Sequence, residues 1–355
     1  MRLLDTASRM NIAVKSHLLD NHKGRAGETL ATDMLWFGDS APRGVIMVSS
    51  GLHGIEGFAG SAAQLAILAQ LGENPPPPGI AVAIVHALNP HGFSYLRRTN
   101  EHNVDLNRNF IDFTDVLPEA PDYETLHPAL VPSHWCGPPR DAADRAIAEA
   151  WGTMGSRDFQ QAVCQGQHVH ADGLFYGGTE PAWSNIMLRA LIADLPANLE
   201  LLVHIDIHTG LGPYGVGELL YTLEPDTPAA VMARDWYGAL GLNVAGGNAS
   251  SATRVRGTMN NAFRLARAQA LSLSIEFGTV AFQRMFAALR EDNLLHHYGI
   301  NDEDVRRSAA QELRQCFNPD DEWWRQAVLD RCDEVLRCTL TRVQHHLGIG
   351  SGVPR

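Results

Sequence analysis

Two histidines and a glutamate stand where they could bind one metal ion. His53 and Glu56 lie in GLHGIEG, an HxxE spacing that lets an imidazole nitrogen and a carboxylate converge on one cation from a tight loop. His208 lies in HIDIHTG, far later in the chain. Two imidazoles and one carboxylate form the three-ligand set of a catalytic zinc, which leaves a fourth position for water. HxxE alone is weak evidence because it often occurs by chance, so the prediction depends on the other motifs.

The identity of the third ligand has a rival in the same segment. His204, Asp206 and His208 alternate along one predicted strand, so all three face the same side and strand geometry leaves His204 open. His208 is preferred because it ends the apolar run and precedes Thr209. Asp206 either orients an imidazole or pairs locally. Four further histidines offer alternative ligands but are interpreted as solvated or hydrogen-bonded residues: His86, His91, His168 and His170.

A longer motif, NPHGFSYLRRTNEHNVDLNRNF, follows a second apolar run. Its NPxGF start, its paired arginines and its VDLNRNF end, together with HxxE, resemble the zinc metallocarboxypeptidase superfamily. That superfamily includes carboxypeptidase A, bacterial murein-peptide amidases, and the succinylglutamate desuccinylase and aspartoacylase branch. The similarity is carried by motifs, from about Val45 to Phe110 and in short segments around His208 and Glu276. It implies a Zn²⁺ cofactor held by the three ligands named above.

The resemblance also implies roles for residues outside the ligand set. An arginine before the DLNR motif polarises the scissile carbonyl; its RxN context favours Arg98, with Arg97 as the rival. Asn107 and Arg108 of the motif would hold a substrate carboxylate, since a guanidinium donates two parallel bonds to that group. Glu276 in SIEFGT would accept a proton from water, a role open to a carboxylate within hydrogen-bond reach.

Two departures from the family pattern affect the expected substrate. Digestive carboxypeptidases carry a tyrosine some way before the catalytic glutamate, but SSATRVRGTMNNAF has none and contains Arg254 and Arg256 instead. These arginines either form a basic pocket or lie on a solvated loop. The segment LFYGGTEPAWSN resembles a poorly characterised bacterial branch of the superfamily, and its Tyr176, Glu180 and Trp183 either line the cleft or hold an insertion in place.

The elements that must position these residues form an α/β pattern. Short β-branched runs alternate with helical stretches, which predicts a mixed, mostly parallel sheet with helices on both faces. Ligands of such sheets bind at the carboxyl ends of the strands, where the motifs lie. The predicted strands are 44–50, 80–88, 201–207 and 270–277, and a helix is expected at 57–71. We interpret 1–355 as one zinc-carboxypeptidase-like domain, with an elaborated insertion at about 112–200 and C-terminal helices at about 301–348.

Composition and charge exclude some classes of partner and indicate where the protein is located. The 355 residues carry a net charge of -12, which argues against nucleic acid or an anionic membrane as a partner. Five cysteines without a CxxC pattern, and an N-terminus without an apolar signal core, indicate a cytoplasmic protein. The chain is compatible with an oligomer.

The expected function is that of a zinc metallopeptidase or amidohydrolase. The substrate would be a carboxylate-bearing small peptide or an N-acyl amino acid, cleaved at an amide bond. An aspartoacylase- or desuccinylase-like deacylase is the alternative within enzymes, and a non-catalytic zinc-containing binding protein is the alternative outside them. No GxSxG elbow follows a strand and no glycine-rich phosphate loop is present, so serine hydrolase and nucleotide chemistry lack support.

Overall fold

One mixed β-sheet crosses the molecule and carries all the strands of the computed structural model, which describes residues 2–224, 226–238, 241–244 and 255–350. Within these residues the order of its eight strands is β1-β2-β4-β3-β5-β8-β6-β7. The strands are β1 (Ala13–Lys23), β2 (Thr29–Gly38), β3 (Gly44–Ser50), β4 (Ile80–His86), β5 (Leu201–Tyr214), β6 (Gly217–Tyr221), β7 (Gly241–Asn243) and β8 (Gln269–Gly278).

The centre of the sheet is parallel. β4, β3, β5 and β8 pair in parallel, while β1 and β2 form an antiparallel edge and β6 runs antiparallel to β8. Every residue of β3 is buried, because parallel strands are covered on both faces. The mixed, mostly parallel architecture predicted from the sequence is therefore confirmed.

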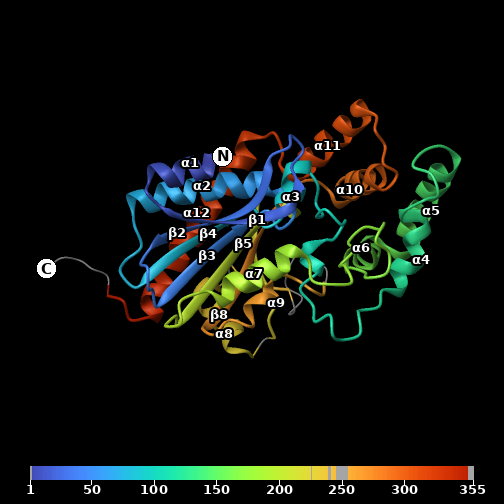
Figure 1. The fold of residues 1–355 in the computed structure, drawn as a ribbon. Coiled ribbons are helices and arrows are strands. Elements are labelled where there is room, and N and C mark those ends of the chain that lie inside the picture. Colours follow the sequence, from blue (N-terminus) through green and yellow to red (C-terminus); the bar gives the residue numbers. More distant parts are fainter. Residues whose placement is uncertain (1, 225, 239–240, 245–254, 351–355) are drawn as a thin grey trace.

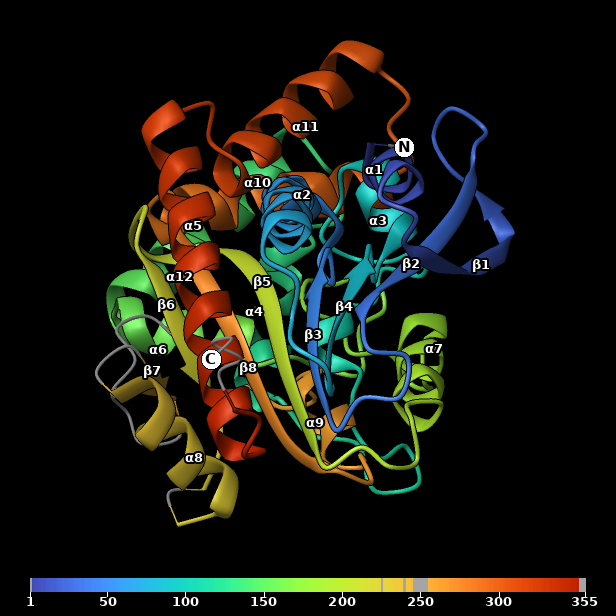
Figure 2. The same ribbon diagram turned by 90° about the vertical axis from the view of Figure 1, so that its left-hand side faces the viewer.

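Helices cover both faces of the sheet, as Figures 1 and 2 show. On one face, α1 (Arg2–Arg9), α2 (Gly57–Glu73), α8 (Pro228–Tyr237) and α12 (Glu322–His346) enclose the largest apolar cluster. On the other face, α7 (Trp183–Ala193) and α9 (Asn260–Phe263) pack against the alternate residues of the same strands.

A third apolar cluster lies beyond the sheet. It joins α4 (Pro121–Leu130), α5 (Pro138–Met154) and α6 (Ser156–Cys164) to α10 (Phe282–His297) and α11 (Glu303–Phe317). Figure 1 shows α4, α5, α6 and α10 gathered at one end of the sheet. Three short helices sit in the connections: η1 (Gly54–Glu56), α3 (Pro90–Tyr95) and η2 (Leu106–Arg108).

The observed elements differ from the prediction at the edges and in one strand. β5 continues to Tyr214, so His208 lies inside the strand rather than at its end. β1 and β2 were not predicted, because β1 is an edge strand with mostly exposed residues and lacks a clear apolar alternation. None of the described helices is long and apolar enough to cross a membrane.

Adjacent tryptophans on α12 allow a test of the packing between that helix and the sheet. Trp324 is fully buried and donates a hydrogen bond from Nε1 to the Gly278 carbonyl at 2.8 Å. Because Trp324→Ala leaves a cavity and removes one of the two hydrogen bonds to the Gly278 carbonyl, it should lower the free energy of unfolding by about 3–5 kcal/mol in denaturant titrations. Trp323 is 62% exposed, so Trp323→Ala should cost less than about 1 kcal/mol. Equal losses for the two variants would contradict this packing.

Candidate metal centre and active site

The predicted metal ligands meet in space. One nitrogen of His53, one of His208 and a carboxylate oxygen of Glu56 all lie within 4.8 Å of one another, and all three residues are buried. The Nδ1 atoms of His53 and His208 are 2.7 and 2.9 Å from Oε1 and Oε2 of Glu56. The two imidazoles therefore present the same ring nitrogen to one carboxylate.

Local geometry explains how the HxxE segment forms this corner. His53 precedes η1, and Glu56 ends it. Gly54 packs against the backbone of α3 so closely that a Cβ would lie 2.0 Å from the Gly92 carbonyl carbon. The Ile55 amide donates to the Arg97 carbonyl at 2.9 Å. Glycine is therefore required at Gly54, and the contact joins the ligand loop to the paired arginines.

A second carboxylate contacts each imidazole at Nε2, the ring nitrogen that does not face Glu56. His53 Nε2 lies 3.2 Å from Asp105 Oδ1, and His208 Nε2 contacts Asp206 Oδ2. Burial alone would lower the pKa of His208, but the charges of Asp206 and Glu56 outweigh it and raise that pKa above its ordinary value. Such carboxylate–imidazole pairs are typical of metal sites, where they fix the ring and leave Nδ1 for the ion.

The charges around the three ligands fit a divalent cation. Four carboxylates converge here, those of Glu56, Asp105, Asp206 and Glu276. Within the described residues, two guanidiniums face the same pocket, those of Arg98 and Arg108. Buried charges must be paired, so with neutral imidazoles and an ionised Glu276 about two negative charges would remain uncompensated, which a Zn²⁺ ion would balance.

The structure separates the two candidate arginines. Arg98 donates from Nη1 to Glu56 Oε1 at 3.2 Å and from Nε to Asp105 Oδ2 at 3.0 Å. Burial disfavours its charge, but these carboxylates outweigh that effect and raise the pKa of Arg98. Arg97 instead bonds Asp292 at 3.0 Å and Asn103 at 3.1 Å, and it does not line the pocket. Arg98 is the arginine beside the predicted ligands.

Asn107 and Arg108 also line this pocket. The Asn107 side-chain oxygen accepts the Met259 amide at 2.9 Å, which leaves its NH₂ group as a donor. Arg108 donates Nε and Nη2 to the Cys164 carbonyl and Nη1 to the Asn107 carbonyl. A guanidinium has five N–H groups, so one on each terminal nitrogen remains for a ligand. The pair retains the donors of a carboxylate fork.

Glu276 faces the ligands from β8, where it is the register partner of His208 on β5. Its side chain is half-buried, and Oε1 accepts the Leu211 amide at 3.0 Å. Burial, together with the charge of Glu56, raises the pKa of Glu276 to about 7. A carboxylate with a pKa near neutrality is suited to accept a proton and return it.

The other histidines lie apart from this corner. His204 stacks on Phe263 with ring centroids 3.9 Å apart, and its ring nitrogens lie 2.8 Å from the hydroxyls of Ser49 and Ser272. Its ring is thus already placed by other contacts. His86, His91, His168 and His170 are outside the pocket as well.

The segment predicted as an insertion, about 112–200, supplies part of the pocket wall. Phe175 lines it, and the guanidinium carbons of Arg98 and Arg108 lie 5.3 and 5.6 Å from its ring centroid. Tyr176 is buried in the core, Trp183 packs against that core, and Glu180 is exposed. None of these three lines the pocket. Arg256 is exposed and outside the pocket, and Arg254 lies outside the described residues.

Two residues were missed in the prediction. Asp105 stands in the DLNR motif itself, so its proximity to the motif was an available signal. Phe175 had no comparable signal, because only the folded insertion brings it to the pocket.

Solved structures similar in fold to this chain include members of the superfamily that the motifs resemble. They include carboxypeptidase A from Helicoverpa armigera, with 16% identity, TM-score 0.43, and 94% of this chain and 71% of that chain covered. An aspartoacylase family protein from Mesorhizobium loti has 12% identity and TM-score 0.40, covering 81% and 67%. The murein-tripeptide amidase MpaA from Escherichia coli O157 has 13% identity and TM-score 0.37, covering 87% and 94%.

The sequence comparisons define the family. No curated protein matches the sequence. A family model described as "Protein of unknown function (DUF2817)" matches residues 1–331, and the chain belongs to that family.

The third ligand can be tested by comparing His208→Asn with His204→Asn. Because His208, unlike His204, presents a nitrogen to Glu56, His208→Asn should lose one zinc equivalent per chain after dialysis, measured by mass spectrometry of the metal. His204→Asn should keep the wild-type content, and circular dichroism should verify folding of both. The assignment is wrong if His204→Asn loses zinc and His208→Asn retains it.

Proposed function

We propose that this protein is a zinc-dependent hydrolase that cleaves the amide bond of a carboxylate-bearing peptide or N-acyl amino acid. The observation that carries the proposal is the convergence of all seven predicted residues on one pocket: His53, Glu56, Arg98, Asn107, Arg108, His208 and Glu276. Three offer metal ligands, two offer donors for a carboxylate, one offers a cation, and one offers a base. This combination fits amide hydrolysis better than metal storage.

Each side chain has a distinct task in this proposal. His53, Glu56 and His208 would hold the zinc ion, which when bound acidifies water and polarises a carbonyl. Arg98 provides a preorganised positive charge where the carbonyl oxygen becomes negative. Glu276 takes a proton from water at a carboxylate oxygen and then donates it to the leaving amine, since its pKa near 7 permits both steps.

The pocket lining favours an apolar side chain next to the bound carboxylate. Beside the predicted site residues, the described lining carries no charged group, and Phe282, Met285, Leu289 and Phe317 form an apolar wall. Burial of such a side chain would add binding energy in proportion to its apolar area. A substrate amino acid with a second carboxylate would find no further described cation in the pocket. Peptides or acyl amino acids with an apolar residue are therefore preferred over acyl derivatives of aspartate or glutamate.

Removal of the proposed base tests the mechanism. Glu276→Gln should keep its zinc but lose about 10²-fold or more in kcat/KM on an N-acyl phenylalanine, because the amide cannot accept the proton of water. Glu149→Gln, at an exposed position of α5, serves as the matched control and should show wild-type rates. A Glu276→Gln variant with undiminished activity would remove the base from the mechanism. Zinc binding without turnover on a broad amide panel would favour the binding-protein alternative.

The carboxylate fork can be tested separately from the chemistry. Arg108→Lys keeps the charge but loses the two parallel donors, so KM should rise about tenfold or more, the scale of hydrogen bonds to a charged group. The same increase should be absent for a substrate whose carboxylate is replaced by a carboxamide. If Arg108→Lys raises KM equally for both substrates, Arg108 does not bind the carboxylate. Faster cleavage of N-acyl aspartate than of N-acyl phenylalanine would instead favour the deacylase alternative.

A further inference from the structure

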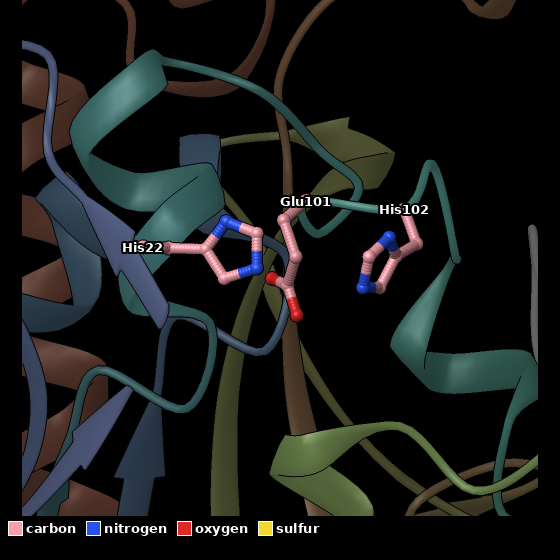
Figure 3. Close-up of side chains that lie close together, drawn as sticks. All are labelled: His22, Glu101 and His102. Atoms are coloured by element: carbon pink, nitrogen blue, oxygen red, sulfur yellow. The ribbon is translucent and has the colours of Figure 1, made fainter. Parts of the chain in front are cut away.

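We propose that His22, Glu101 and His102 form a second binding site for a zinc-type divalent metal ion, separate from the site at His53. The three side chains come from two distant segments and converge on the Glu101 carboxylate, which lies between the two imidazoles in Figure 3. One ligand atom from each lies within 4.8 Å of the other two. His22 and Glu101 are half-buried, and His102 is exposed.

Within the part of the chain that the structure describes, the ring of His22 meets the rings of His91 and His102 edge-on. Among the described residues, no hydrogen bond or ion pair joins the side chains of His22, Glu101 and His102 to one another or to a neighbour, although their polar atoms are close. Ligand atoms of a tetrahedral zinc stand about 3.4 Å apart, since each bond is about 2.1 Å long. The three ligand atoms lie within 4.8 Å of one another, and small rotations of these partly exposed side chains would bring them to the tetrahedral spacing.

A second surface cluster shows the contrast. His127, His170 and Asp172 also lie within 4.8 Å of one another. There, however, His127 Nε2 lies 3.5 Å from Asp172 Oδ1, and His170 Nε2 lies 3.3 Å from Glu124 Oε2. The two imidazole rings stack with centroids 3.6 Å apart. The Nε2 atoms of both imidazoles thus face carboxylates, whereas Nδ1 of His127 is buried without a hydrogen-bond partner.

The backbone holds the two segments of the proposed site in place. The Asn100 side-chain oxygen accepts the amides of His102 at 3.0 Å and Val104 at 2.8 Å, so the turn that carries the ligands is closed on itself. His22 lies in the part of β1 where the pairing with β2 shifts register, and such bulges redirect side chains. The ligand positions are therefore set by the fold, which reduces the entropy lost on metal binding.

The donor set selects the class of metal. Two imidazoles and one carboxylate suit Zn²⁺, Co²⁺ or Ni²⁺, whereas Mg²⁺ and Ca²⁺ favour oxygen ligands. With three protein ligands, water completes the coordination. Both histidines must be neutral to bind the ion.

The site connects the sheet edge to the candidate active site. Glu101 and His102 lie between Arg98 and Asp105 in sequence, and those two residues contact each other at the predicted catalytic corner. A metal ion held by His22 from β1 would thus join the edge strand to the loop that positions Arg98 and Asp105.

Zinc titration of the metal-stripped full chain tests this proposal. In calorimetry, wild type should bind two zinc equivalents per chain. His102→Ala and His22→Gln should each bind one. His345→Ala, an exposed histidine on α12, serves as the control and should bind two. Excess Mg²⁺ should not compete. His102→Ala is the least disruptive variant because its side chain is exposed.

The same titration separates this site from the proposed catalytic one. His53→Ala should bind one equivalent, and the variant with both His53→Ala and His102→Ala should bind none. In His53→Ala, zinc should still raise the melting temperature through the remaining site. The proposal is overturned if His102→Ala binds as many zinc equivalents as wild type. If only the catalytic proposal fails, His102→Ala should still bind one zinc equivalent fewer than wild type.

Discussion

The candidate active site depends on the compensation of buried negative charge. Glu56 stands between two imidazoles, and each ring is held on its far side by Asp105 or Asp206. An isolated buried carboxylate would be costly, so these groups stay ionised only when cations face them. Arg98 meets part of that need through its bonds to Glu56 and Asp105. The remaining negative charge favours binding of a divalent cation at this corner. The need to compensate buried charge therefore explains why the ligands, Arg98 and the outer carboxylates lie together.

The central strands and the predicted site residues could be read from the sequence because their signals are local. β3 and β4 are mostly apolar runs, β5 and β8 alternate apolar with polar residues, and the motifs follow these strands or lie within them. Parallel pairing then brings the ends of distant strands together, as the register of His208 with Glu276 shows. The site residues were thus accessible because each motif sits beside a strand that the sheet must align.

Other choices were favoured by sequence context or missed, because they depend on tertiary contacts. Arg97 and Arg98 are adjacent and chemically equivalent, and only the positions of Asp292 and Asp105 in the fold separate them. His204 and His208 likewise share one side of β5, but the ring of His204 is taken up by Ser49 and Ser272. The edge strand β1 escaped prediction because its exposed residues show no apolar period. Propensity and spacing contain no information about such partners.

Burial explains why clusters with similar ligands take different roles. His53, Glu56 and His208 are buried and surrounded by charged side chains, so a bound ion would act strongly on a substrate in the pocket. At His22, Glu101 and His102, solvent reaches the ligands, and the pocket that Glu101 lines contains none of the seven predicted site residues. Solvent weakens the electrostatic effect of an ion there, but it leaves coordination intact. The exposed cluster therefore suits attachment of one segment to another, while the buried cluster suits chemistry.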